Sequence, residues 1–374
     1  MRRTAGLLAT LALAAAACTP TATAPTASAA PQKTGNFKQA KLDIAYSFFS
    51  DNSVHLPTSK VLLTSALDSM KKEVKAAGGS TDVATPTFTD TPEFSLPDFK
   101  LFAAAAGALA AMSPAVSADR LSRAGVIGMM TADPDCHTYY LDGRSVVESR
   151  PASTRGTGPQ IPSGGTAIQA QPDAAGLQAK LLDGGIAYVT WHEFAVNGTY
   201  NIKDTVKAVL DKAVAAGAKA FIFDLRANIG GNGDDVMAAW FLNAGDPLVK
   251  VLVRTGNAGT KTAATGLRLP AAYQVPIAII LNDQGGSAPE VFALAMKENK
   301  RATIVGGKST GCLGGTSSTP LGDGSELYVV QQEFVGGVTG AKYNNVGIPP
   351  DVAADDASAV ATASKVLLDK IAGR

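Results

Sequence analysis

Hydrophobic positions divide the chain into a first part with helical spacing and a second part in which strands and helices alternate. Between residue 37 and about residue 130, apolar side chains recur at i, i+3, i+4 and i+7, which is the spacing of an amphipathic helix. Two such sets are Leu42, Ala45, Tyr46 and Phe49, and Leu62, Leu63, Leu67 and Met70. A loop rich in Thr, Pro and Asp interrupts the pattern over residues 78–97. We therefore predict a small all-helical domain of three or four helices over residues 37–131.

The periodicity is weaker over residues 132–183. Asp133 and Pro134 open a turn that leads into a short predicted strand. Residues 149–175 are then rich in Pro, Gly, Ser and Thr and show no periodicity, so we predict a long irregular connection there. Connections of this length are usually functional or disordered.

Residues 184–374 carry alternating strand and helix patterns. The predicted strands cover residues 186–191, 218–225, 247–254, 276–281, 301–305 and 327–334. The predicted helices cover residues 202–216 and 236–242, a segment that follows Ser287, and residues 357–371. Because a strand, a crossover helix and a second strand form a right-handed unit, the alternation predicts an α/β domain with a mainly parallel sheet.

Composition excludes several classes of partner. The 33 Lys and Arg residues nearly balance the 32 Asp and Glu residues, and the net charge is +1. Nothing in the charge therefore points to nucleic acid or to an anionic surface. The sequence has neither a cluster of metal-ligand residues nor a nucleotide-binding loop, so we expect no metal and no other cofactor. At 374 residues, the chain is long enough for two domains with buried cores.

The N-terminus has the features of an export signal. Residues 1–18 combine a pair of arginines, a short apolar run and small residues that end at Cys18. Cys18 is a lipidation candidate, because residues 19–36 after it have the composition of a disordered tether. The alternative is cleavage near Ala29 and Ala30, which would discard Cys18. Either route predicts an extracytoplasmic protein, which is secreted or held by its lipid on the outer face of the bacterial cytoplasmic membrane.

Export changes the interpretation of the two remaining cysteines, Cys136 and Cys312. An even number of cysteines in an oxidising compartment makes a disulfide reasonable. If the two residues lie far apart in the fold, they are instead small buried side chains.

Ser287 lies at a predicted turn between the strand over residues 276–281 and a helix. Two glycines before it let the backbone approach a ligand, and the N-terminus of the helix supplies N–H donors and partial positive charge. This setting suits a nucleophile. The alternative is a capping box formed by Ser287 and Glu290, in which the hydroxyl only satisfies amides of the helix.

A second loop, over residues 224–231, also follows a predicted strand. Open α/β sheets place ligands at such ends, and its two glycine amides could bind a developing oxyanion. The alternative is a tight turn whose polar side chains pair only with the fold; these are Asp224, Arg226 and Asn228. Of the three histidines, His137 is the best candidate for a base, because it lies at the join of the two predicted parts, where clefts tend to form.

Four segments together resemble a known family. They are Asp133-Pro134-x-x-His137-Thr138-Tyr139, Asp224-Leu225-Arg226-x-Asn228-x-Gly230-Gly231, Ser287-Ala288-x-Glu290 and Gly347-Ile348-x-Pro350-Asp351. Their order and spacing resemble those of the C-terminal-processing (tail-specific) serine peptidases, over about residues 120–356. The resemblance implies a ClpP/crotonase-like core of repeated β-β-α units.

The chain is closer to one branch of that family. The processing branch uses a lysine about 25 residues after the serine, and this chain has Cys312 near that place. The branch of the tricorn core and the interphotoreceptor retinoid-binding protein uses a histidine just before a tyrosine, and His137 matches it. The residues between Tyr140 and Gly184 are too few for the PDZ domain of the family.

Two departures accompany this match. Cys136 stands where the tricorn type has a serine, and Asn344 stands near the place of a glutamate that orients the histidine. We therefore expect His137 to lack a carboxylate behind it, which would slow catalysis. Because Cys136 adjoins the histidine and Cys312 takes the lysine's place, the resemblance also implies a disulfide between them.

The resemblance implies an exported serine-type peptidase that acts on peptides or proteins. Ser287 would be the nucleophile, His137 the base, and the amides of Gly230 or Gly231 with that of Ala288 the oxyanion hole. The supporting positions are Asn344, Asp224, Arg226, Asn228 and Glu290. Two alternatives stay open: a weakened or inactive relative that binds an apolar ligand or a peptide, and a cell-surface protein-interaction module. The oligomeric state is not predicted.

Overall fold

The structure is a computed structural model that describes residues 37–143, 145–149, 158–197 and 200–374. The predicted export signal, the tether and Cys18 lie outside the described residues. Within the described part of the chain, no helix combines the length and the apolarity that a membrane span requires.

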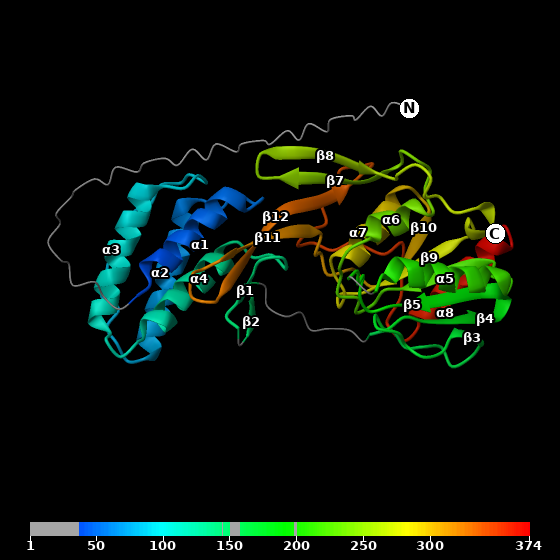
Figure 1. Cartoon of the computed structure of the whole chain (residues 1–374), viewed down its shortest axis with the longest axis horizontal. Coiled ribbons are helices and arrows are strands. Elements are labelled where there is room, and N and C mark those ends of the chain that lie inside the picture. The colour runs from blue at the N-terminus through cyan, green and yellow to red at the C-terminus, as the bar shows by residue number, and fades with distance from the viewer. Residues whose placement is uncertain (1–36, 144, 150–157, 198–199) are drawn as a thin grey trace, which may run out of the picture. The chain divides into compact units, whose positions relative to one another are not determined.

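Four helices lie between residues 37 and 132, in blue and cyan in Figure 1. They are α1 (Gln39–Asn52), α2 (Ser59–Ala76), α3 (Leu96–Met112) and α4 (Ala118–Ala132). Side chains cap three of them: Thr58, Ser95 and Ser117 each accept a hydrogen bond from an amide in the first turn. Apolar spacing therefore predicted these helices correctly, and the caps explain where three of them begin.

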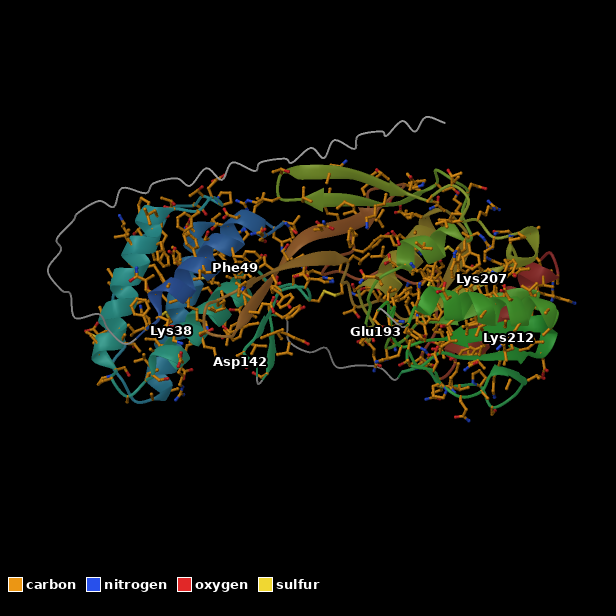
Figure 2. All side chains as sticks on the ribbon, viewed as in Figure 1. Lys38, Phe49, Asp142, Glu193, Lys207 and Lys212 are labelled. Atoms are coloured by element: carbon orange, nitrogen blue, oxygen red, sulfur yellow. A yellow bond between two sulfur atoms is a disulfide. The ribbon has the colours of Figure 1, made fainter. Side chains whose placement is uncertain are left out.

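The helices share a core with strands from later in the chain. Phe49, labelled in Figure 2, is fully buried with Tyr46 of the same helix. Leu327 and Val329 from strand β12 belong to the same apolar cluster, and so does Tyr140 of β1. The segment that carries His137 therefore leaves α4 and enters the sheet beside a well-packed helical layer.

One sheet is antiparallel. Its strands are β1 (Tyr139–Leu141), β2 (Val146–Glu148), β7 (Pro247–Val253), β8 (Gly256–Thr262), β11 (Gly314–Pro320) and β12 (Glu326–Gly336). They follow the order β2-β1-β12-β7-β8, and β11 pairs with β12 as well. The short strand β1 fixes the end of the His137 loop by pairing with β12 in the register Tyr139 to Tyr328.

The other sheet is mostly parallel and has the order β13-β10-β9-β6-β5-β4-β3. Its strands are β3 (Thr166–Gln169), β4 (Gln178–Leu182), β5 (Ile186–Thr190), β6 (Ala220–Asp224), β9 (Ile277–Leu281), β10 (Ala302–Gly306) and β13 (Val352–Ala353). The pairs from β5 to β13 are parallel, whereas β4 pairs antiparallel with β3 and with β5. Every residue of β5, β6 and β9 is buried, as their continuous apolar runs predict.

Alternate residues of these strands enter two different cores. In β5, Ala187 and Val189 pack on the face that α5 and α7 cover, while Ile186 and Tyr188 pack with α8. The helices of this part are α5 (Ile202–Ala215), α6 (Asp234–Ala239), α7 (Ala288–Glu298) and α8 (Ala359–Ile371), with short 3₁₀ turns η1 (Asp183–Gly185) and η2 (Ala271–Tyr273). The predicted α/β arrangement with a mainly parallel sheet is confirmed.

Several strands differ from the sequence prediction. The predicted strands at 247–254 and 327–334 form, but they belong to the antiparallel sheet. The prediction of an irregular connection over 149–175 is wrong at residues 166–169, which form β3. Strands β8 and β11 were not predicted, because β8 is exposed along its whole length and β11 consists of Gly, Ser, Thr and Pro. Neither strand has the hydrophobic alternation on which strand prediction depends.

Candidate active site

Ser287 occupies a strained backbone position between β9 and α7. Its φ is 71° and its ψ is −121°, in a region that residues other than glycine rarely adopt. Two hydrogen bonds hold this turn: the Ser287 amide donates to the Cys312 carbonyl oxygen at 2.9 Å and to Glu290 Oε2 at 3.3 Å. A Cβ on Gly286 would lie 2.8 Å from Cys312 Cβ, so the turn requires glycine there. Strain of this kind is characteristic of functional turns.

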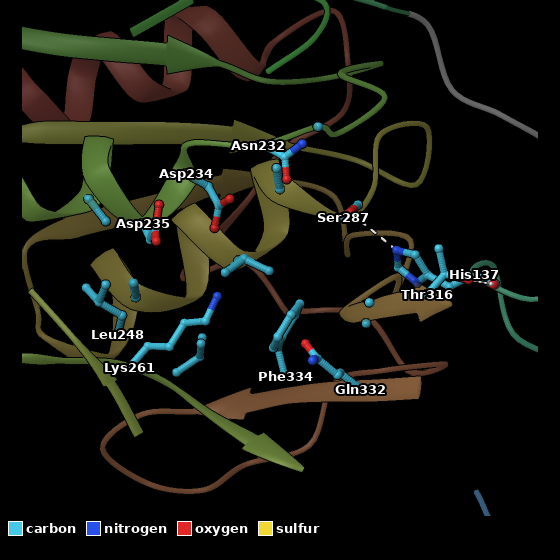
Figure 3. A pocket seen from close by; sticks show the side chains of 18 residues that line it. His137, Asn232, Asp234, Asp235, Leu248, Lys261, Ser287, Thr316, Gln332 and Phe334 are labelled. Carbon is cyan, nitrogen blue, oxygen red and sulfur yellow. Dashed lines mark hydrogen bonds between the residues drawn. The ribbon is translucent and has the colours of Figure 1, made fainter. Parts of the chain in front are cut away.

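The Ser287 hydroxyl faces His137. The distance from His137 Nε2 to Ser287 Oγ is 3.3 Å, although the two residues are 150 positions apart (Figure 3). In the first turn of α7, the Glu290 amide donates to the Ser287 carbonyl oxygen at 2.9 Å. The hydroxyl is therefore within reach of an imidazole. The predicted capping box of Ser287 and Glu290 is present as well, because the Glu290 side chain accepts from the Ser287 amide.

Glu290 anchors the loop beside Ser287. It is fully buried, and its carboxylate accepts hydrogen bonds from the Gly311 amide and from the Cys312 amide, both at 2.7 Å. The Ser309 hydroxyl donates to the same carboxylate. Burial raises the pKa of Glu290 above its ordinary value, while these hydrogen bonds act in the opposite direction. Glu290 therefore fixes Cys312 and the Ser287 turn relative to each other.

The two cysteines meet beside His137. Their Sγ atoms are in direct contact, and their Cα atoms lie 5.8 Å apart. His137 Nδ1 lies 3.2 Å from the sulfur of Cys136. Cys136, His137 and Cys312 are also the potential metal ligands that gather in the described part of the chain. Cysteine binds metals as a separate thiolate, and two sulfurs this close do not provide two such ligands.

Asp135 is a site residue that the sequence prediction missed. It is fully buried, and its Oδ1 lies 2.7 Å from the His137 amide nitrogen and 3.4 Å from His137 Nδ1. The expectation that His137 has no carboxylate behind it is therefore wrong. Burial alone would raise the pKa of Asp135, but hydrogen bonds and charge from His137, with a hydrogen bond from Asn344, hold it below its usual value.

The local sequence contained a signal for this contact. An aspartate often folds its side chain back to the amide two residues later, in an Asx turn, and Asp135 stands two residues before His137. Asn344, which was predicted as a supporting position, contacts the same carboxylate: its Nδ2 donates to Asp135 Oδ2 at 2.6 Å, and its Oδ1 accepts from the Leu313 amide at 2.9 Å.

The polar side chains of the 224–231 loop pair with the fold. Arg226 and Asp224 form a buried two-point ion pair, with distances of 2.9 Å and 2.7 Å. Asn228 Nδ2 donates to the Trp191 carbonyl oxygen at 2.9 Å, and its Oδ1 accepts from the Gly230 amide at 3.0 Å. These three side chains shape the loop and do not enter the cavity next to Ser287.

The glycines of this loop adjoin the serine. A Cβ on Gly230 would lie 2.8 Å from Ser287 Cβ, and its φ of 98° also favours glycine. The Gly230 amide is engaged with Asn228. Gly231 and Ala288, by contrast, line the cavity that opens beside Ser287.

This cavity has a volume of about 390 Å³ and connects the Ser287–His137 pair with a charged end. The carboxylates of Asp234 and Asp235 lie across the cavity from His137 (Figure 3). Burial, and then the charge of Asp235, raise the pKa of Asp234 to about 7, although Lys261 acts in the opposite direction. The sequence prediction missed this charged end, because Lys261 lies on the unpredicted strand β8.

The central part of the chain is similar to a known peptidase family. Residues 185–354 match the model of Peptidase family S41. Through this segment, the chain is similar to peptidase family S41. The resemblance that four short motifs indicated is confirmed at the level of the family.

Curated relatives match over about half of the length of this chain. A carboxy-terminal-processing protease of Bartonella bacilliformis is 27% identical over 173 residues, which are 46% of this chain and 39% of that protein. The chloroplastic carboxyl-terminal-processing peptidase 3 of Arabidopsis thaliana is 30% identical over 176 residues, which are 46% of this chain and 32% of that protein. The chain therefore matches less than half of the length of each relative.

A solved structure of a candidate peptidase from Parabacteroides merdae has a similar fold. It aligns with a TM-score of 0.52 and 18% identity, over 70% of this chain and 86% of that one. Ser287 and Glu290 lie inside the segment that matches the S41 family model, whereas Asp135, Cys136 and His137 precede it. The base candidate therefore comes from a part of the chain that the family model does not cover.

Proposed function

We propose that this protein is an exported serine-type peptidase in which Ser287 attacks the scissile carbonyl and His137 accepts its proton. The observation that carries the proposal is the 3.3 Å contact between Ser287 Oγ and His137 Nε2 at the edge of a cavity of about 390 Å³. A serine hydroxyl becomes an effective nucleophile when a base lies within hydrogen-bond reach. The same imidazole then returns the proton to the leaving amine.

The oxyanion hole consists of the amides of Gly231 and Ala288. Both residues line the cavity beside Ser287, and Ala288 is the first residue of α7, where amides have no partner within the helix. Gly230 was the other candidate, but its amide is engaged with Asn228. Its role is to let the loop approach Ser287 closely.

The supporting residues hold these parts in place. Asp224, Arg226 and Asn228 shape the loop that carries Gly231, and Glu290 fixes the Ser287 turn. Asn344 joins the Leu313 amide to the carboxylate behind His137.

We assign a disulfide to Cys136 and Cys312. Their Cα atoms lie 5.8 Å apart, within the usual range for a disulfide, and the bridge joins the His137 loop to the loop that Glu290 anchors. It closes a segment with a sequence separation of 176 residues. A disulfide agrees with the export signal predicted at residues 1–18, with lipidation at Cys18 as the means of attachment.

The same proposal includes the branch of the family and the boundaries of the domains. We assign the chain to the tricorn-core branch, because the lysine of the processing branch is absent and His137 lies beside the serine. Residues 132–183 form the histidine loop and connector, and residues 184–374 a ClpP/crotonase-like peptidase domain. The helical segment at residues 37–131, in which α1–α4 pack around one apolar cluster, is the N-terminal domain.

A fluorophosphonate probe tests the assignment of the nucleophile. The purified protein should be labelled, Ser287→Ala should not be labelled, and His137→Ala should be labelled far more slowly. Ser318→Ala is the matched control, because Ser318 is an exposed serine on β11, and it should label like the parent. Labelling that persists in Ser287→Ala would refute this nucleophile.

Peptide hydrolysis separates a peptidase from a binding protein. A peptide library should be cleaved by the parent and not by Ser287→Ala. An inactive relative would instead retain an apolar ligand or a peptide in the cavity equally well with and without the Ser287 hydroxyl, and an interaction module would depend on α1–α4 alone.

A further inference from the structure

We propose that Asp135 is the positioning residue that orients His137, and that Asn344 and the pair of His55 and Asp133 hold its carboxylate in place. The inference rests on the proposed function, because it concerns the same base. It assigns a role to a residue two positions before the histidine and to a loop of the helical segment.

Hydrogen bonds to its own amide and carbonyl oxygen hold the backbone of Asp135 in place. Its amide donates to Ser149 Oγ at 2.9 Å, and the Ser149 hydroxyl donates back to the Asp135 carbonyl oxygen at 2.6 Å. The Thr138 amide donates to the same carbonyl oxygen at 3.0 Å. A side chain on such a constrained turn points in one direction, so its carboxylate is presented to His137 without a large loss of entropy.

The two carboxylate oxygens have separate partners. Oδ1 accepts from the His137 amide at 2.7 Å and lies 3.4 Å from His137 Nδ1. Oδ2 accepts from Asn344 Nδ2 at 2.6 Å. Since Asn344 is a neutral amide, it can orient the carboxylate but cannot replace its charge. Asp135 therefore supplies the negative charge next to the imidazole.

This charge selects the tautomer that the reaction requires. When Nδ1 carries its hydrogen toward a carboxylate, Nε2 is free to accept the Ser287 proton, and the imidazolium that forms is stabilised. The sulfurs of Cys136 and Cys312 also lie near Nδ1, at 3.2 Å and 3.7 Å. Sulfur is a weak acceptor, whereas hydrogen bonds to a carboxylate are charge-assisted, so Asp135 determines the orientation.

A further contact to Asp135 comes from His55, in the loop between α1 and α2. His55 Nδ1 lies 2.7 Å from Asp133 Oδ1, and His55 Nε2 lies 3.8 Å from Asp135 Oδ2. The hydrogen bond with Asp133 raises the pKa of His55 above its ordinary value. Protonated His55 places positive charge near Asp135 and favours its ionised form. The helical segment is thereby connected to the base.

Asp135→Asn tests the charge with little change in shape. We expect kcat to fall by roughly 10-fold or more with KM nearly unchanged, because the lost interaction strengthens in the transition state. The acid limb of the profile of kcat/KM against pH should move to lower pH, since the imidazolium loses a stabilising charge. Asp98→Asn is the matched control: Asp98 is also buried and accepts from the Thr89 amide at 3.1 Å. Ser95 is the cap of α3, and Asp98 lies in the first turn of that helix, remote from His137. The control should lower stability without moving the acid limb.

A rescue variant moves the charge to the neighbouring side chain. Asn344 Nδ2 lies 2.6 Å from Asp135, so Asp135→Asn combined with Asn344→Asp exchanges the amide and the carboxylate. We expect the acid limb of the double variant to return toward that of the parent and kcat to recover in part. A double variant no better than Asp135→Asn alone, in a chain with parent-like stability, would overturn the role of the charge.

Titration of the His137 imidazole by NMR, in Ser287→Ala with and without Asp135→Asn, requires no activity. The imidazole pKa should fall when Asp135 is replaced, because the imidazolium loses a neighbouring negative charge, while His192 serves as an internal reference. An unchanged His137 pKa overturns the inference. A lowered pKa in a protein that cleaves no peptide supports the Asp135 contact and refutes only the proposed function.

Discussion

Glu290 Oε2 lies 3.3 Å from the amide nitrogen of Ser287 and 2.7 Å from that of Cys312, so one buried carboxylate holds the Ser287 turn and the Cys312 loop together. Its other oxygen accepts from the Gly311 amide and the Ser309 hydroxyl. Every partner of this carboxylate is therefore a donor.

Glu290→Gln should lower the free energy of unfolding by about 2–4 kcal/mol, because the new NH₂ group would face donors in a buried site. Urea unfolding measures the loss, and fluorophosphonate labelling should slow as the Ser287 turn loosens. Glu298→Gln on the same helix is the control, since its partners Val338 and Thr339 are exposed. That change should cost less than about 1 kcal/mol. Equal losses in the two variants would contradict the anchoring role.

Arg226→Met should cost about 3–5 kcal/mol, because it leaves the Asp224 carboxylate buried without its cation. Asp224→Asn combined with Arg226→Met should recover most of that loss. The double-mutant cycle, measured by urea unfolding, gives the coupling directly. A double variant as unstable as the sum of the single changes would show that the pair is not coupled.

Reduction should destabilise the protein by about 2–5 kcal/mol, as removal of a bridge that closes a long loop does. Cys136→Ser combined with Cys312→Ser should have the stability of the reduced parent and should not respond to reductant. Alkylation followed by intact mass measurement identifies the thiols. Two alkylated cysteines in the native, non-reduced protein would remove the disulfide from the proposal.

Asp234→Asn should stabilise the protein at pH 8 and leave its stability unchanged near pH 4. The pKa of this carboxyl is about 7 in the fold and 3.8 ordinarily, so the folded protein binds the extra proton and loses stability as the pH rises between these values. Because the side chain is only partly buried, we expect a gain of about 2 kcal/mol, below the full shift. Unfolding curves at the two pH values provide the test.

The same ionisation changes the charge that a substrate meets in the cavity. The ratio of kcat/KM for a peptide that presents lysine to the cavity over one that presents norleucine should rise from pH 6 to pH 8, as Asp234 gains its charge. Titration of His137 affects both peptides and cancels in the ratio. In Asp234→Asn the ratio should not change with pH. A constant ratio in the parent would show that Asp234 does not face the substrate.

Hydrophobic periodicity predicted the parts of the fold that bury apolar faces. It located α1–α4 and the strands at the centre of the parallel sheet, because Leu, Ile, Val and Phe recur there at the period of each element. It failed for β8 and β11, whose stability comes from backbone pairing with neighbours. Such strands acquire their conformation from a partner elsewhere in the chain.

Motif spacing selected Ser287 and His137, and the structure brings them to 3.3 Å. The same reasoning overlooked Asp135, because the expected carboxylate position was 209 residues further along, at Asn344. An Asx turn depends on local backbone angles, which residue identity alone does not determine. Asp234 and Lys261 were overlooked because they meet only where α6 and β8 border one cavity.

The proposed base and the proposed nucleophile come from different sheets: His137 precedes β1 of the antiparallel sheet, and Ser287 follows β9 of the parallel one. A chain that has completed only one sheet during folding therefore carries half of the pair. Contacts between residues 150 positions apart form late, since loop closure opposes them. Under the proposed function, a partly folded molecule therefore has no hydrolytic capacity, which arises only when both sheets have formed.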